Sequence, residues 1–110
     1  MHSLTFDNQF NNSKLFFSKS ELSKILSCYS VGVSRGSWKD YAIEFQKNEA
    51  NFYMFKNSLT LPDCILTKSK ILKKNEIIFK LNFYNIKKNN SSQIDDLLII
   101  LKRNNFKIIK

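Results

Sequence analysis

A chain of 110 residues has room for one domain with one hydrophobic core. An apolar fraction of 43%, with 2 glycines and 1 proline, excludes a low-complexity or disordered chain. The net charge of +9 is compatible with a nucleic-acid partner, but arginine, the residue best suited to phosphate and base contacts, occurs only at Arg35 and Arg103. Lys, Asn, Ile and Phe share AT-rich codons and are enriched together, so we attribute part of the charge to composition bias.

Residues 1–16 are polar and rich in asparagine, and their apolar residues fit neither the helical nor the strand period. We expect a flexible arm here and a single domain over residues 17–110. The arm lacks a basic stretch leading into an apolar core, and no run in the chain reaches the roughly 20 apolar residues of a membrane span. We therefore expect a cytoplasmic protein with no membrane partner, in which Cys28 and Cys64 are free, buried thiols.

A helix is predicted over residues 18–35. Ser18 and Glu21 have the spacing of a capping box, in which each side chain bonds the backbone N–H of the other residue. Gly36 is a suitable helix stop. The apolar residues that recur at helical spacing, and so form the expected buried stripe, are Leu22, Ile25, Leu26, Tyr29 and Val33.

Strict alternation after the helix predicts an antiparallel hairpin. Its first strand carries Tyr41, Ile43 and Phe45 on one face. Its second strand, residues 50–55, places Phe52 and Met54 on one side and Tyr53 and Phe55 on the other. Because both faces of the second strand are apolar, we expect something to cover each.

The remaining elements are predicted from shorter patterns. We expect a third strand over 64–67, a basic connector over 68–75, a fourth strand over 77–83 and a turn over 85–91, with one further short strand beginning near Tyr84 as an alternative. Ser92 is the predicted cap of a helix over residues 93–103, which ends at Asn104 and Asn105 and buries Ile94, Leu97, Leu98 and Leu101. The order predicts an α+β fold: an N-terminal helix, an antiparallel meander of three to five strands and a C-terminal helix, with both helices packed on one face.

The first half of the chain resembles a small alphaproteobacterial family of unknown function. The residues that carry the resemblance are Phe17, Glu21, Leu22, Ile25, Leu26, Tyr29, Gly36, the run from Trp38 to Ile43, Phe45, Ala50, Phe52, Phe55 and Pro62. The core motif of the family is a Trp, a basic residue and then Asp-Tyr-Ala-Ile. The resemblance implies a bacterial, cytosolic setting and brings no assigned activity, cofactor or catalytic residue.

The sequence predicts no enzyme. His2 is the only histidine and lies in the arm, so a histidine-based triad is excluded, and Cys28 has no histidine to activate it. Cysteine, histidine and aspartate do not cluster at metal-binding spacings, and Gly32 and Gly36 do not make a phosphate loop. We expect no catalytic residue, no metal site and no cofactor.

Two kinds of contact residue stand out instead. For Trp38 we favour a structural role, in which the indole ring seals the edge of the core and its N–H donates to a carbonyl. The alternative is that Trp38 anchors a partner protein. A partner surface would comprise Trp38, Lys39, Tyr53 and Phe55. Candidate anion or nucleic-acid contacts are Lys68, Lys70, Lys73, Lys74, Lys87 and Lys88, whose two connectors we expect at opposite ends of the sheet. The leading hypothesis is a non-catalytic protein-binding or regulatory module, which includes a homodimer; nucleic-acid binding is the alternative.

Overall fold

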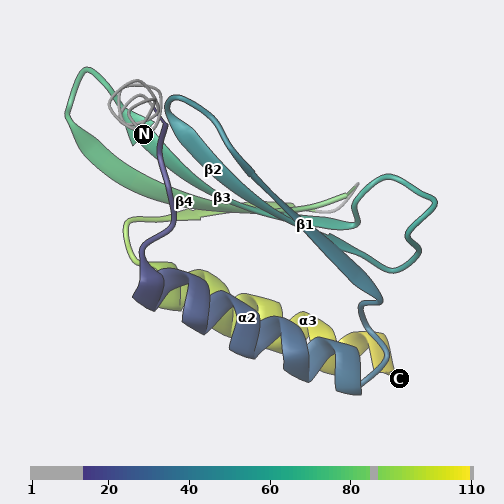
Figure 1. Cartoon of the computed structure of the whole chain (residues 1–110). Coiled ribbons are helices and arrows are strands. Elements are labelled where there is room, and N and C mark those ends of the chain that lie inside the picture. Colours follow the sequence, from purple (N-terminus) through teal and green to yellow (C-terminus); the bar gives the residue numbers. More distant parts are fainter. Residues whose placement is uncertain (1–13, 85–86, 110) are drawn as a thin grey trace.

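The chain folds into a sheet with two helices on one side (Figure 1). The computed structural model describes residues 14–84 and 87–109. The elements are α2 (Lys19–Ser34), β1 (Asp40–Phe45), β2 (Glu49–Phe55), β3 (Cys64–Ile71), β4 (Glu76–Phe83), β5 (Lys87–Ser91) and α3 (Ile94–Ile109). The strands form a five-stranded antiparallel meander in the order β1-β2-β3-β4-β5. The predicted α+β class is confirmed, and the predicted arm falls almost wholly outside the described residues.

Local hydrogen bonds fix both ends of α2. Ser18 is the N-cap: its Oγ accepts from the Glu21 N–H at 3.0 Å, and its own N–H donates to Glu21 Oε1 at 2.7 Å. At the other end Gly36 has a φ of 83°, a left-handed conformation that glycine adopts without strain. The Gly36 N–H donates to Val33 O and the Ser37 N–H to Gly32 O, which is a Schellman motif. The predicted capping box and helix stop are confirmed.

The register of the strands divides the sheet into two faces. Residues directly opposite each other in an antiparallel pair point to the same side, and neighbours along a strand point to opposite sides. Phe52 stands opposite Ile43 and Leu66, and Leu66 stands opposite Leu81. These residues face the helices, and we call this side the covered face.

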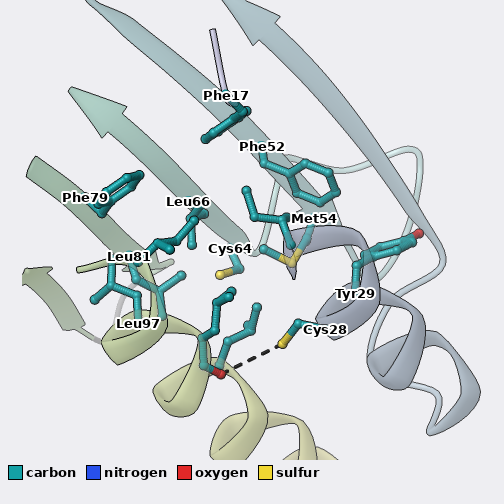
Figure 2. Packing of buried hydrophobic residues seen from close by; sticks show 14 of the residues in the cluster. Phe17, Cys28, Tyr29, Phe52, Met54, Cys64, Leu66, Phe79, Leu81 and Leu97 are labelled. Atoms are coloured by element: carbon teal, nitrogen blue, oxygen red, sulfur yellow. Dashed lines mark hydrogen bonds between the residues drawn. The ribbon is translucent and has the colours of Figure 1, made fainter. Parts of the chain in front are cut away.

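The covered face and the two helices enclose the core (Figure 2). Phe52, Leu66 and Leu81 are each 0% exposed. Ile25 and Leu97 bring the helix stripes against them. The predicted buried stripe of the C-terminal helix is confirmed, because its residues Ile94, Leu97, Leu98 and Leu101 are all buried. In the N-terminal helix Val33 is 43% exposed, so its predicted burial is wrong; the neighbouring Gly32 is buried instead.

Three predicted boundaries are wrong. The third strand continues from Thr67 to Ile71, because Lys68, Ser69 and Lys70 pair with β4 on one side and the first two also pair with β2 on the other. The predicted turn over 85–91 contains β5, a strand without an apolar residue that forms by pairing with β4. The alternative of one further short strand is therefore confirmed, although this strand begins at Lys87 and not near Tyr84. The last helix runs to Ile109, since two asparagines lower helix propensity by only a few tenths of a kcal/mol each and do not stop a helix.

Candidate functional site on the open face of the sheet

The side of the sheet opposite the helices is what we call the open face. Among the described residues, both long helices lie on the other side (Figure 1). The strand residues on the open face are Asp40, Ala42 and Glu44 of β1; Glu49, Asn51, Tyr53 and Phe55 of β2; Ile65, Thr67, Ser69 and Ile71 of β3; Glu76, Ile78, Lys80 and Asn82 of β4; and Lys88 and Asn90 of β5. This face is mixed in character, unlike the apolar covered face.

The open face contains a hollow with a volume of about 240 Å³. We call it the sheet hollow. Towards β1 and β2 it is lined by Gln46, Glu49, Asn51 and Tyr53, and in the middle by Ile65 and Thr67 of β3. Towards β4 and β5 its lining includes Lys80, Asn82, Lys88 and Asn90. Residues from every strand except β1 therefore converge on one concave surface, which has both polar and apolar parts.

A row of polar residues crosses the whole sheet through this hollow. Strand register places these residues opposite one another in the order Glu44, Asn51, Thr67, Lys80 and Asn90. Within the row the Thr67 hydroxyl donates to Asn51 Oδ1 at 2.6 Å. Asn51 is only 6% exposed, so this bond satisfies a buried acceptor and fixes the orientation of the amide. The Asn51 side chain is thereby held in place at the centre of the hollow.

Tyr53 and Glu44 form the second polar contact of the open face. The Tyr53 hydroxyl donates to Glu44 Oε1 at 2.5 Å. Burial, this hydrogen bond and the charges of Glu44 and Glu49 together raise the pKa of Tyr53 to about 12. The same bond is the main cause that lowers the pKa of Glu44. Tyr53 therefore stays neutral, and Glu44 stays ionised, over the physiological pH range.

The predicted partner contacts do not come together. Tyr53 and Phe55 lie half-buried on the open face, as the alternation predicted. Lys39 is exposed at the corner before β1, where its N–H donates to Phe55 O at 2.8 Å. Trp38 is only 2% exposed and belongs to the core, so its ring is not available to a partner. This burial favours the structural role of Trp38 over the role of a partner anchor. Its Nε1 is buried without an acceptor among the described residues, so the expected bond to a carbonyl is absent there.

The predicted lysine contacts are also dispersed. Lys68 is not in a connector but in β3, where its Nζ donates to Glu21 Oε1 at 2.8 Å and to Phe16 O at 2.9 Å. Lys70, Lys73 and Lys74 lie at the β3–β4 turn, and β5 begins with Lys87 and Lys88 at the opposite end of β4. The eight residues of β4 separate the two groups by about 23 Å at the usual rise per residue. The expected positions at opposite ends are confirmed, and within the described residues the two groups do not form one basic groove.

The hollow also contains residues that sequence reasoning did not select. Lys80 and Asn82 lie on β4 at positions that alternate with the buried Phe79, Leu81 and Phe83. That alternation was the available signal, because it places both side chains on the face away from the core. Their neighbours in the hollow depend on strand register, which a single sequence does not display.

The reactive groups of the described chain lie away from the hollow. Cys28 and Cys64 are free and buried in the core, and burial is the main cause that raises the pKa of each thiol. Within residues 14–84 and 87–109, no group of three or more His, Cys, Asp and Glu is placed to hold a metal ion. None of the described helices is both long and apolar enough to cross a membrane.

These features define a two-layer α+β domain with a hollow on the sheet face that lies away from the two described helices. Residues 15–97 match the family described as Protein of unknown function (DUF2794), and the chain belongs to that family. No curated protein and no solved structure matches the chain. The resemblance to a family of unknown function is confirmed; the bacterial group and the core motif around Trp38 remain predictions.

Proposed function

We propose that this domain is a non-catalytic protein-binding module whose open sheet face receives a partner protein. The observation that carries the proposal is the sheet hollow, a concavity of about 240 Å³ on the side of the sheet away from the two helices. The folded core needs only the covered face, because the buried strand residues with the lowest exposure all point that way. As far as the described residues show, the open face is therefore available for recognition.

The composition of the open face suits a protein surface. Tyr53, Phe55 and Ile65 are only partly exposed and supply apolar area, while Asn51, Thr67 and their neighbours supply hydrogen-bonding groups. Protein interfaces combine these two kinds of side chain, and tyrosine is enriched in them. A chain held by such a face would exclude water from Tyr53 and bond the amides around it.

Nucleic acid is less well supported by the same face. Glu44, Glu49 and Glu76 lie on it beside Lys80 and Lys88, so a polyanion laid across the strands would meet carboxylates as well as ammonium groups. The other predicted lysines lie at the two ends of β4 or, in the case of Lys68, in an ion pair. The phenylalanines that a sheet-based RNA reader would use for stacking, Phe52, Phe79 and Phe83, are buried in the core.

A groove between the helices is the competing surface. It has a volume of about 400 Å³ and includes Lys24, Cys28, Asp95 and Lys102 in its lining. Lys24 and Asp95 are already paired across it at 3.2 Å. The groove therefore has fewer free polar groups to offer a partner than the sheet hollow, and we place recognition on the sheet.

Site-specific photo-crosslinking in the organism that encodes the chain tests the proposal. A benzophenone amino acid replaces Asn90, which is exposed in the hollow, and in a matched variant it replaces Ser30, which is exposed on α2. We expect a discrete protein adduct from position 90 and none from position 30. An adduct with a second copy of the chain supports a homodimer through the same face. Equal yields at both positions, or none at position 90, would contradict the proposal.

A further inference from the structure

The sheet hollow is rich in hydrogen-bond donors that have no partner. Lys80, Lys88, Asn82 and Asn90 line it from β4 and β5, and none of their side chains bonds another described residue. The Oδ1 of Asn51 accepts the hydrogen bond of the Thr67 hydroxyl, which leaves the N–H groups of the Asn51 amide free to donate. Several donors, two of them charged, thus point to one concavity without an acceptor in the described part of the chain.

The acceptors on the opposite flank are partly in use. Glu44 accepts the hydrogen bond of Tyr53 at 2.5 Å, which leaves Glu49 as the carboxylate that lines the hollow without a bonded partner among the described residues. The hollow is therefore polarised across the strands: its β4–β5 side is basic and rich in donors, and its β2 side ends in one free carboxylate. A ligand that complements both sides has a fixed direction.

We infer that the partner segment is acidic, with at least one carboxylate over Lys80 and Lys88 and its remaining length directed towards Glu49. This inference rests on the proposed function and names the chemistry of the partner. A carboxylate accepts from two ammonium groups and neighbouring amides at once, and such charge-assisted hydrogen bonds are about twice as strong as neutral ones. Nucleic acid fits this arrangement less well, because its phosphates repeat along the chain. A nucleic acid bound at Lys80 and Lys88 would also place a phosphate over the Glu49 carboxylate, which would repel it.

Charge reversal in the crosslinking experiment tests the inference. Lys80→Glu with Lys88→Glu changes the charge inside the hollow, and the matched control, Lys70→Glu with Lys74→Glu, makes the same change at the β3–β4 turn. Urea unfolding confirms that each variant folds. We expect the adduct from position 90 to fall about tenfold or more with the hollow pair and to change little with the control pair.

The outcomes separate this inference from the proposed function. An adduct that survives reversal of Lys80 and Lys88 overturns the acidic partner but leaves a protein on the open face. An equal fall with both pairs also overturns it, since the effect is then one of overall charge. No adduct in the parent protein removes the proposed function itself.

A titration of the purified chain gives an independent reading. The probe is an eight-residue peptide with two glutamates at one end and serines over the rest of its length. Its binding is followed by NMR through the backbone amides of Lys80, Asn82 and Asn90. The comparators are the same peptide with two lysines in place of the glutamates and a single-stranded DNA. We expect the glutamate peptide to shift these amides and the lysine peptide to leave them unchanged. Larger shifts of the same amides with DNA than with the glutamate peptide would overturn the inference in favour of nucleic acid.

Discussion

The two faces of this sheet are built by the same five strands and differ in almost every other respect. On the covered face Phe52, Leu66 and Leu81 are 0% exposed, whereas one residue further along each strand stand Tyr53, Thr67 and Asn82, all partly exposed. Strand alternation thus places stability and recognition on neighbouring residues of one strand. The effect of a substitution should therefore depend on the face that the residue occupies more than on the strand that carries it.

The largest expected contrast is between Phe52 and Tyr53. Phe52→Ala leaves a cavity in the centre of the core and should cost about 3–5 kcal/mol of unfolding free energy, a large part of the total for a domain of this size. Tyr53→Ala loses one hydrogen bond and part-buried area, so we expect less than about 2 kcal/mol. Urea unfolding followed by circular dichroism measures both, and equal losses would contradict the division into two faces.

Two lysines extend the comparison to charged residues. Lys68 lies on the covered face, paired with Glu21 at 2.8 Å, and the two side chains are 12% and 21% exposed. Lys68→Met leaves Glu21 without its cation, and because the pair is only partly buried we expect a loss of about 1–3 kcal/mol. Lys80→Met on the open face should stay within about 0.5 kcal/mol. A Lys80→Met loss as large as that of Lys68→Met would show that the open face also supports the fold.

The Lys68 contact also predicts a pH dependence. Burial alone would raise the pKa of Glu21, but the hydrogen bonds from Lys68 and from the Ser18 N–H, with the charge of Lys68, outweigh it and lower the pKa from 4.5. Since the pKa is lower in the folded chain, the contribution of Glu21 is present above about pH 4.5 and is lost as the pH falls through the folded value. The free energy of unfolding, measured from pH 6 to pH 3, should fall less steeply in Glu21→Gln than in the wild type. An unchanged slope would contradict this prediction.

Features set by local chemistry could be predicted from the sequence. The capping box at Ser18, the stop at Gly36 and the two-sided pattern of β2 need only neighbouring residues. The alternation of β2 already placed Tyr53 and Phe55 on the face opposite Phe52 and Met54. We expected both faces of β2 to be covered. In the described structure the helices cover one of them, the face that carries Phe52 and Met54.

Features set by pairing between distant residues could not be predicted from the sequence. Lys87 to Ser91 contains no apolar residue, and it is a strand only because β4 offers a free edge. Thr67 and Lys80 become neighbours through the register of β3 with β4, which depends on where the turn between them falls. The hollow is made of such pairs, so its residues could be assigned to a face from the sequence but not assembled into a site.

The last comparison concerns a single hydroxyl group on the open face. Tyr53→Phe removes the hydrogen bond to Glu44 and keeps the ring, so at neutral pH we expect a loss of about 0.5–1.5 kcal/mol. Because the folded pKa of Tyr53 is raised to about 12, the stability that its protonated form supplies is complete below pH 10 and declines as the pH rises towards 12. The difference between wild type and Tyr53→Phe should therefore shrink above pH 10.

Absorbance at 295 nm follows this tyrosine directly. The difference titration between wild type and Tyr53→Phe isolates its ionisation, and Glu44→Gln is the control because it removes a charge that raises the pKa of Tyr53. We expect Tyr53 to ionise at lower pH in Glu44→Gln, since its phenolate no longer faces the Glu44 carboxylate. An unchanged midpoint would mean that Glu44 does not hold the Tyr53 hydroxyl.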